Sequence, residues 1–368
     1  AAAAAAAIEM GIRRVWPNAE TRLCPMADGG EGTLDAVLSG RGQRDSVRVA
    51  GASGAPVEAG YGLLDGSFIA VIESAQVVSL TDPIGTAIDV EMRSTRGIGE
   101  LMLRLLDAGA RRFMIGLGGS STNDGGAGLL AALGFALTSA DGTVVEPTPA
   151  GLATLAAVHA EGLDPRLSAS RITIMSDVTN PLCGPHGATA IFGPQKGVRA
   201  DRIATVDERI AHFATLAEGA VGRNAQDLPG AGAAGGLGFA LQLLGGEPRS
   251  GAEVVADLVG LDAALDDADW LITGEGHSDA QTLQGKTPLV VARHATAQNV
   301  PATLISGGID PAALPELGRH FAGCFALPAG PATLEQCVAH ATTLLADRAE
   351  QAARLWSAAR GLVARMVS

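Results

Sequence analysis

The segment Gly116-Leu-Gly-Gly-Ser-Ser-Thr-Asn-Asp-Gly-Gly-Ala-Gly128 decides the fold class of this chain. The apolar run Phe113-Met-Ile-Gly-Leu117 in front of it is typical of a buried strand, and residues 126–133 show a helical pattern. In open α/β sheets, ligands bind beyond the carboxyl ends of the strands. Glycines at such a turn let backbone N–H groups approach an anion, and the helix N-terminus adds a favourable dipole. The segment therefore predicts an anion-binding turn between a strand and a helix.

Several residues of this turn are candidates for ligand binding. The candidates for substrate or phosphate contact are Gly118, Gly119, Ser120, Ser121, Thr122 and Asn123. Asp124 is a candidate to orient a substrate or to hold Mg²⁺, directly or through water. The alternative is a tight turn whose Ser, Thr and Asp side chains cap the helix. The dinucleotide-binding fingerprint is excluded, because Gly116 and Gly118 are not followed by a third glycine at the required place.

Three further apolar runs, residues 172–175, 271–273 and 303–306, are typical of buried strands. Each ends at glycine or at small polar residues, and amphipathic stretches such as 98–106 and 333–345 lie before and after the predicted strands. Strands that alternate with helices indicate a parallel sheet with helices on its faces. The sequence therefore predicts the α/β class.

Two stretches depart from this alternation. Residues 47–72 hold short β-like runs separated by glycines, a pattern closer to hairpins than to crossovers, and residues 181–197 are rich in Gly and Pro. We interpret both as parts of a second α/β domain inserted into the first, so that both domains are discontinuous. The predicted first domain comprises residues 1–45, 94–150 and 255–368, and the inserted domain comprises residues 46–93 and 151–254.

The composition fits a folded cytoplasmic protein and excludes some partners. Of the 368 residues, 47% are hydrophobic and 18% are charged, which argues against disorder. The formal net charge of −13 argues against binding to nucleic acid or anionic membrane, because both require a basic surface. No apolar run reaches the roughly 20 residues of a spanning helix, and the start, Ala1 to Ala7, lacks the basic region of a signal peptide. The four cysteines have no CxxC spacing, so reduced structural thiols are expected.

Carboxylates among glycines or after strands form a second group of candidates. Asp28-Gly-Gly-Glu-Gly32 suits metal chelation through Asp28 and Glu31, although Asp28 could equally cap a helix over residues 31–38. Asp177 follows a predicted strand, where a carboxylate can take the proton of a substrate hydroxyl, the general-base role in phosphoryl transfer. Asn180, three residues later, is assigned to substrate binding.

Two lysines are candidates for phosphate binding. Lys196 lies between Pro194 and Gly197 in a loop, and the alternative for it is an ordinary solvated side chain. Gly285-Lys-Thr-Pro288 suggests a P-loop but fails the pattern, because residue 280 is Ala where glycine is required. Lys286 and Thr287 could still contact phosphate as a point charge and a hydroxyl. Glu275 precedes them as a metal candidate, and residues 232–238 are either an anion nest or a close-packed helix entrance.

Taken together, these segments resemble the bacterial glycerate kinase family. The matching stretches, in the family's order, are Pro25–Thr33, Gly118–Gly128, Asp177–Pro185, Phe192–Gly197, Gly232–Gly238, and Ile272–Gly276 with Gln281–Pro288. The resemblance implies a Rossmann-like parallel-sheet domain and an inserted α/β domain of flavodoxin-like type, with the active site in the cleft between them. It also implies ATP, Mg²⁺ and glycerate as ligands. The family's usual opening strand and Ala-Pro-Asp-Ser-Phe-Lys-type loop have no match here, and His277 stands where the family often has Arg.

The resemblance implies phosphorylation of glycerate during glyoxylate or sugar-diacid breakdown, with 2-phosphoglycerate favoured over 3-phosphoglycerate. In this reading Asp177 is the base, the Gly118–Gly125 loop and the two lysines hold phosphates, and a homo-oligomer is possible. One alternative is a kinase of another small hydroxy acid or sugar acid. Another is a ligand-binding relative that has lost its chemistry.

Overall fold

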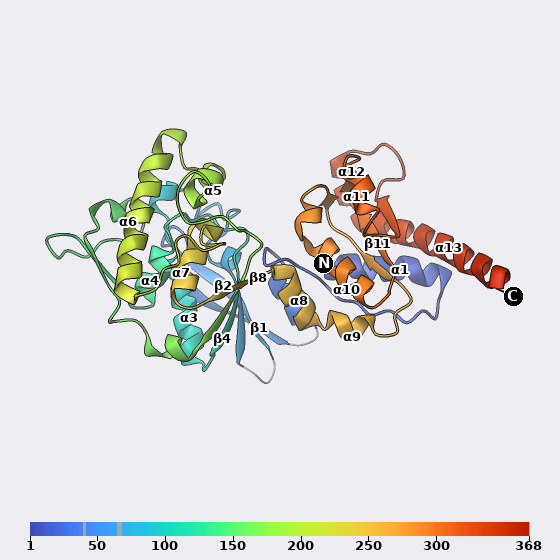
Figure 1. Ribbon diagram of the computed structural model, residues 1–368, viewed down its shortest axis with the longest axis horizontal. Helices are drawn as coiled ribbons and strands as arrows, with labels where there is room; N and C mark the ends of the chain where they lie inside the picture. Colours follow the sequence, from blue (N-terminus) through green and yellow to red (C-terminus); the bar gives the residue numbers. More distant parts are fainter. Residues whose placement is uncertain (40–41, 65–67, 368) are drawn as a thin grey trace. The chain divides into compact units, whose positions relative to one another are not determined.

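The computed structural model describes residues 1–39, 42–64 and 68–367, with side chains up to residue 359. The chain divides into two compact units. We call residues 28–34 and 40–251 the central unit, and residues 1–27, 35–39 and 252–368 the terminal unit. Figure 1 labels the elements of both units.

The central unit is built on a six-stranded mixed sheet with the order β1-β2-β3-β4-β7-β8. These strands are β1 (Gly42–Ala50), β2 (Pro56–Leu64), β3 (Ile69–Glu73), β4 (Arg112–Gly116), β7 (Arg171–Met175) and β8 (Glu247–Arg249). β1, β2 and β3 are antiparallel neighbours, which confirms the hairpins predicted over residues 47–72. β3, β4, β7 and β8 are parallel to one another, so their carboxyl ends meet at one edge.

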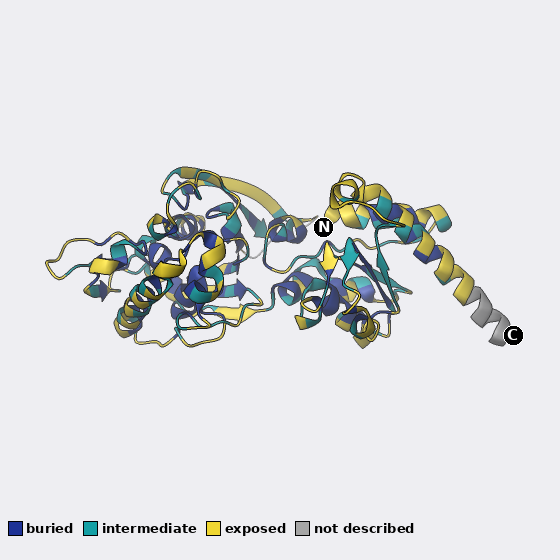
Figure 2. Ribbon diagram, turned by 90° about the horizontal axis from the view of Figure 1, so that it is seen from above, coloured by how far each residue is buried: buried dark blue, intermediate teal, exposed yellow. Residues whose placement is uncertain are grey.

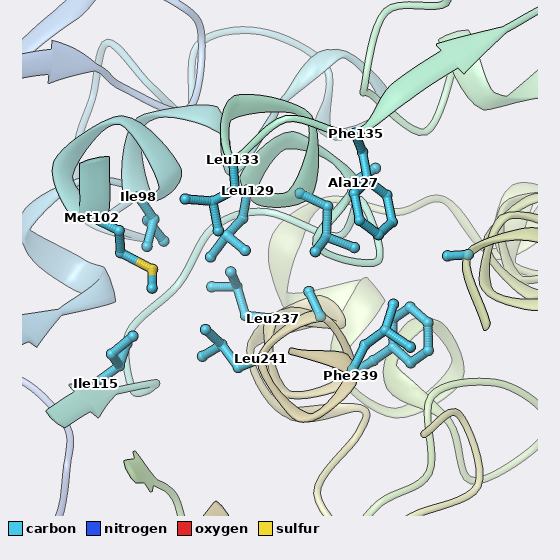
Figure 3. Close-up of a cluster of buried hydrophobic side chains, with 14 of the residues drawn as sticks. Ile98, Met102, Ile115, Ala127, Leu129, Leu133, Phe135, Leu237, Phe239 and Leu241 are labelled. Atoms are coloured by element: carbon cyan, nitrogen blue, oxygen red, sulfur yellow. The ribbon is translucent and has the colours of Figure 1, made fainter. Parts of the chain in front are cut away.

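Helices complete the central unit and bury its core. They are α3 (Arg96–Asp107), α4 (Ala127–Ala132), α5 (Ala188–Lys196), α6 (Ile203–Val221) and α7 (Leu237–Leu243), with a small sheet of β5 (Ala136–Thr138) and β6 (Ala157–His159). α3 buries Ile98 and Met102 at helical spacing, the pattern that predicts it from sequence. Figure 3 shows these two side chains with Leu129 of α4, Leu241 of α7 and Ile115 of β4 in one apolar cluster.

The division into units differs from the sequence prediction for residues 28–34, 42–45 and, above all, 94–150. The sequence pattern groups them with the chain termini, whereas the structure places them in the central unit. The reason is β4, which pairs with β3 on one side and with β7 on the other. A strand followed by a helix looks the same in either sheet, so the chain order alone does not reveal its neighbours.

The terminal unit has a parallel three-stranded sheet with the order β13-β11-β9 and a two-stranded sheet of β10 and β12. Its strands are β9 (Leu271–Thr273), β10 (His277–Ser278), β11 (Ala302–Ser306), β12 (Gly308–Ile309) and β13 (Gly323–Ala326). Its helices are α1 (Ala2–Val15), α8 (Gly251–Val259), α9 (Leu261–Leu265), α10 (Thr287–Ala297), α11 (Leu314–Leu317), α12 (Leu334–Ala339) and α13 (Ala341–Val367). α2 (Thr33–Leu38) contributes its last four residues.

Contacts between distant parts of the chain close the terminal unit. α1 lies beside α13, as Figure 1 shows, and Gly11 is needed there because a Cβ would lie 2.1 Å from the carbonyl oxygen of Ala346. All three tryptophans meet in this unit, with Trp270 stacked on Trp356 and edge-on to Trp16. In Figure 2 the buried residues, in dark blue, lie inside each unit. The predicted helix over 333–345 is in fact two helices separated at His340.

The four cysteines are free thiols, as the sequence predicts. Burial raises the pKa of the Cys183 thiol, which disfavours the reactive thiolate form. Along the part of the chain that the structure describes, no helix is both long and apolar enough to cross a membrane.

His294 makes the stability of the terminal unit depend on pH. Its Nδ1 lies 2.7 Å from Asp262 and its Nε2 lies 2.9 Å from Glu253, so the ring links α8, α9 and α10. Burial alone would lower the pKa of His294, but the two carboxylates outweigh it and raise the pKa above its usual value. The stabilisation is therefore complete below about pH 6.5 and is lost as the pH rises through the raised pKa.

We expect the urea midpoint of the wild type, followed by tryptophan fluorescence, to fall more steeply from pH 6 to pH 9 than that of His294→Gln. Because all three tryptophans lie in the terminal unit, this signal reports on the unit that contains His294. His320→Gln, a change at an exposed histidine of the same unit, serves as the control and should keep the wild-type slope. Parallel slopes for wild type and His294→Gln would contradict the assignment.

Candidate active site

The carboxyl ends of four parallel strands form the candidate site of the central unit. The register pairs Glu73 with Gly116, Gly116 with Met175, and Met175 with Arg249, so the four strands end level with one another. The loops that leave them begin at residues 74, 117, 176 and 250. Two of these loops contain the predicted glycine turn and the predicted base, which are thereby brought to the same edge.

The Asp28–Gly30 loop crosses this edge in close contact with the strand ends. The Gly118 N–H donates to the Gly29 carbonyl at 3.2 Å. A Cβ at Gly116 would lie 2.4 Å from the Gly29 oxygen, and one at Gly118 would lie 2.5 Å from the Gly30 Cα. Only glycine permits backbones to approach this closely, which explains why glycines are needed at these positions. The structure thus brings Asp28 to the predicted anion-binding turn.

Exposed carboxylates stand on the loops at this edge. Asp28 and Asp177 are both exposed, and Asp177 follows β7 by two residues. A Cβ at Gly29 would lie 2.7 Å from the Met175 carbonyl oxygen, so the two carboxylate-bearing loops touch. Glu31 is exposed on the same loop as Asp28. Asp28 does not cap α2, because that helix begins only at Thr33.

The side chains that follow Gly119 are directed into the protein rather than toward a ligand. Ser120 accepts a hydrogen bond from Lys196, and Ser121 donates to the Val78 carbonyl at 3.0 Å. Asn123 donates through Nδ2 to Thr189 Oγ1 at 3.0 Å. The Thr122 Oγ1 and Asn123 Oδ1 atoms are buried, with no hydrogen-bond partner in the described part of the chain. Four of the six predicted contact residues are therefore buried at this loop, whereas Gly118 and Gly119 stay accessible.

Asp124 is a structural carboxylate, which corrects its prediction as a metal ligand. It is fully buried and accepts hydrogen bonds from the Thr95 N–H and Thr95 Oγ1, both at 2.8 Å. The N–H groups of Gly126 and Gly128 donate to it at 3.0 and 3.2 Å. Burial raises the pKa of this carboxyl, and the hydrogen bonds oppose the increase. Asp124 thus joins the N-terminal ends of α3 and α4, where carboxylates are favourable.

Lys196 is neither in a loop nor solvated. It is the last residue of α5, is 4% exposed, and is followed by Gly197 in the left-handed conformation. Its ammonium donates to Ser120 Oγ at 3.0 Å and to the Thr122 carbonyl at 2.8 Å. Burial lowers the pKa of Lys196 to about 7, while Asp124 acts to raise it. The lysine predicted to hold phosphate therefore holds the glycine-rich loop in this structure.

Asn180 and the glycines of residues 232–238 also have structural contacts. Asn180 donates through Nδ2 to the His186 carbonyl at 2.8 Å, and its own carbonyl accepts from the Gly232 N–H. A Cβ at Gly235 would lie 2.1 Å from the Thr122 oxygen, and one at Gly236 would lie 2.4 Å from the Gly125 Cα. Of the two interpretations offered for this glycine-rich stretch, the structure favours close packing over an anion nest.

The remaining predicted residues belong to the terminal unit. Glu275 follows β9 by two residues, and its Oε1 accepts from Ser278 at 2.8 Å and from Thr282 at 2.6 Å. Lys286 is the N-cap residue of α10, and Thr287 is the first residue of that helix. Pro288 has no N–H, and the N–H groups of Leu289 and Val290 donate to the Lys286 carbonyl at 3.0 and 3.2 Å. The donors left for an anion are therefore the Thr287 N–H and hydroxyl and the Lys286 ammonium. Lys286 and Thr287 lie at a helix start, as the corresponding residues of a P-loop do, but the P-loop glycine is absent because residue 280 is Ala.

The predicted metal candidates do not assemble into a preformed metal site. Among the described residues, no three His, Cys, Asp or Glu side chains are grouped so that they could hold a metal ion. The Asp124 carboxylate already accepts hydrogen bonds from backbone N–H groups, and Glu275 lies in the terminal unit. Asp28 and Glu31 remain as exposed carboxylates at the strand edge.

Comparison with known proteins identifies the family. The family model described as the glycerate kinase family matches residues 1–357. The chain belongs to the glycerate kinase family. It is 41% identical over 345 residues to a glycerate kinase of Bacillus subtilis (strain 168), covering 92% of this chain and 89% of that protein.

Two further relatives agree. A glycerate 2-kinase of Escherichia coli (strain K12) is 41% identical over 307 residues, which is 83% of this chain and 81% of that protein. The crystal structure of a candidate glycerate kinase 2 from Salmonella typhimurium LT2 is similar with a TM-score of 0.86 and 39% identity. It covers 98% of this chain and 95% of that chain. The α/β fold class predicted from sequence is therefore confirmed.

Membership of the glycerate kinase family makes this chain an enzyme, a phosphotransferase with an alcohol group as acceptor. The prediction of a kinase is thus confirmed, and kinase membership implies ATP and a small-molecule substrate. ATP and its acceptor carry or develop negative charge, so a kinase site needs donors and cations more than apolar surface. The turn at Gly118 and Gly119 presents backbone rather than apolar side chains.

Sequence reasoning missed two buried charged residues of this edge. Glu73 is 1% exposed at the end of β3 and accepts from the Leu34 N–H of α2 at 2.5 Å and from Gln76 at 3.0 Å. Arg93 is 5% exposed and lies beneath the glycine-rich loop. The sequence did contain a sign of Glu73, because this carboxylate directly follows the apolar run Ile69-Ala-Val-Ile72, where a charged residue is unusual. No pattern marked Arg93.

Proposed function

We propose that this kinase transfers the γ-phosphoryl group of ATP to glycerate and favours 2-phosphoglycerate as the product, within organic acid breakdown. The proposal rests on the family match and on one structural observation. The loops that carry Asp28, Gly118–Gly119 and Asp177 all lie at the same edge of the central sheet. The name of the Escherichia coli relative, a glycerate 2-kinase, supports the preference for the 2-hydroxyl.

Asp177 is proposed as the general base. An exposed carboxylate just beyond a strand end can reach a bound hydroxyl and accept its proton as the oxygen attacks phosphorus. Gly119 is proposed to face the anionic groups of the substrate with its backbone, because it is exposed at the turn, whereas the Gly118 N–H already donates to the Gly29 carbonyl. Lys286 and Thr287 are proposed to bind phosphate at the start of α10.

Asp28, with Glu31 nearby, is proposed to hold Mg²⁺. Magnesium in kinases is bound by one or two protein carboxylates, with phosphate oxygens and water completing its shell. The exposed Asp28 carboxylate fits this requirement, whereas Asp124 does not because it is fully buried and both of its oxygens accept hydrogen bonds. When bound, the ion supplies charge neutralisation at the transferred phosphoryl group.

Phosphorus NMR of a reaction with glycerate, ATP and Mg²⁺ tests the proposal, because it reports both activity and the position of the phosphate. We expect the signal of 2-phosphoglycerate to appear as ATP is consumed. A signal of 3-phosphoglycerate alone would overturn the preference for the 2-hydroxyl. ATP consumption with another small hydroxy or sugar acid, but not with glycerate, would support the alternative substrate class. The absence of turnover with every acid would support a non-catalytic relative.

A further inference from the structure

Arg93 carries a positive charge into the interior of the central unit. Its guanidinium donates five hydrogen bonds, and every acceptor is a backbone carbonyl. These acceptors are Thr86 at 3.0 Å, Ile88 at 2.9 and 3.2 Å, Ser121 at 3.1 Å and Lys196 at 3.0 Å. A buried charge is costly unless it is fully hydrogen-bonded, and Arg93 uses all five of its donors.

The five bonds join three segments that are far apart in the sequence. One is the turn at residues 86–88, another is Ser121 in the glycine-rich loop, and the third is the end of α5 at Lys196. The last carbonyls of a helix have no intrahelical donors, and a cation there is favourable. A flat guanidinium with donors on three sides can satisfy such a junction, whereas the single ammonium of lysine cannot.

Lys196 extends this junction back to the same loop. Its carbonyl accepts from Arg93, and its ammonium donates to Ser120 Oγ and to the Thr122 carbonyl. The two cations thus hold Ser120, Ser121 and Thr122, three consecutive residues. These residues directly follow the accessible Gly118 and Gly119, so they fix one end of the part that faces solvent.

We propose that Arg93 is a positioning residue for the kinase reaction, which fixes the Gly118–Gly119 backbone toward an anionic ligand by holding Ser121 and the end of α5. This inference rests on the proposed function of the strand edge. An anion at this turn also gains from the Arg93 charge beneath it, and from Lys196 while that residue is protonated, in a chain whose net charge is −13. The proposed recognition of the anion uses the backbone of the turn, so it requires no side chain at Gly118 or Gly119.

The test compares Arg93→Gln and Arg93→Lys with the full-length wild type, in kcat and KM for glycerate and for ATP. We expect Arg93→Gln to raise the KM of one of these anionic ligands by about tenfold or more, because a loosened turn binds it less well. Arg93→Lys should recover part of the loss, since it keeps the charge but not the planar donors. Arg166→Gln is the matched control, because Arg166 pairs with Asp164 and Asp107 in the same unit. Its KM values should stay within about twofold of the wild type.

A second readout separates positioning from a general loss of folded structure. The charged groups that act on the Lys196 ammonium are Asp124, which raises its pKa, and Arg93, which adds to the lowering caused by burial. If deprotonation of Lys196 loosens the loop, kcat/KM falls as the pH rises through the pKa of Lys196, and removing the Arg93 charge should move this limb to higher pH. In Arg93→Lys, which keeps the positive charge, the pH at which kcat/KM falls should stay near the wild-type value. A structural defect alone would reduce activity at all pH values without moving the limb.

Hydrogen exchange of the amides of residues 118–122 gives a readout that does not depend on activity. We expect faster exchange there in Arg93→Gln, with exchange in α6 unchanged. Unchanged KM values, an unmoved pH limb and wild-type exchange in a folded Arg93→Gln protein would overturn the proposal. If Arg93→Gln did not fold, the same three measurements on Arg93→Lys would decide. If the wild type turned over no glycerate, the proposed function would fail, and the exchange measurement would still decide the role of Arg93.

Discussion

Replacing Asp177 with Asn should reduce kcat with glycerate by about 10²–10⁴-fold, the range that a positioned general base contributes. The amide has nearly the same shape as the carboxylate but cannot take the proton of the attacking hydroxyl. Because Asp177 is exposed beyond the end of β7 and asparagine keeps its size, the fold and the KM for ATP should change little. Steady-state kinetics with a coupled ADP assay, together with circular dichroism of the variant, would measure both effects.

Two parallel variants make this prediction specific. Asp201→Asn changes a carboxylate that is 62% exposed in the same unit and pairs with Arg199, and it should leave kcat near that of the wild type. Asp28→Asn changes the other exposed carboxylate at the strand edge. Near-normal turnover in Asp177→Asn would remove Asp177 from the base role. A loss in Asp28→Asn that excess Mg²⁺ restores would support the Mg²⁺ role of Asp28, and a loss that Mg²⁺ does not restore would point to Asp28 as the base. Normal turnover in both variants would remove this edge from the chemistry.

The position of the candidate site follows from the sequence because it depends on local patterns. A strand that ends in glycines, and another that ends before Asp177, must both finish at the same edge once the strands are parallel. The contact of the Asp28 loop with this edge rests on Gly116, Gly118 and Gly29, whose lack of side chains was visible in the sequence. These predictions require only strand direction and steric size.

The direction of individual side chains could not be predicted in this way. Ser120, Ser121 and Asn123 carry groups suited to a ligand, yet their partners lie at Lys196, Val78 and Thr189. These partners are 43 to 76 residues away along the chain. A hydroxyl or an amide has the same chemistry whether it contacts a ligand or another part of the protein. Only the packed structure distinguishes the two.

The same reasoning applies to the units and to the second glycine-rich stretch. β4 joins the central sheet through its neighbours β3 and β7, which no property of residues 112–116 alone specifies. Residues 122–125, more than 100 residues earlier in the chain, pack directly against Gly235 and Gly236. A side chain at either glycine would clash with them. The sequence therefore revealed that small residues were needed there, and the structure revealed what they contact.

Replacing Asp124 with Ala should lower the free energy of unfolding of the central unit by about 3–5 kcal/mol, the range for breaking a buried charged network. The change leaves the N–H groups of Thr95, Gly126 and Gly128 buried without their acceptor. Each unsatisfied buried donor costs about 1–3 kcal/mol. Urea unfolding followed by far-ultraviolet circular dichroism would measure the loss, and hydrogen exchange should quicken in α3 and α4.

Asp124→Asn distinguishes this structural role from the metal role that the sequence predicted. An amide can accept through only one atom, and its NH₂ group would face either the Gly126 N–H or the donors of Thr95 and Gly128. Asp124→Asn should therefore also be destabilised, whereas Asp45→Asn, at an exposed position on β1, should stay within about 0.5 kcal/mol of the wild type. An Asp124→Asn protein with wild-type stability and a raised Mg²⁺ requirement would instead restore the metal role. A destabilised variant whose remaining folded fraction keeps the wild-type Mg²⁺ requirement would establish that Asp124 acts by joining α3 to α4.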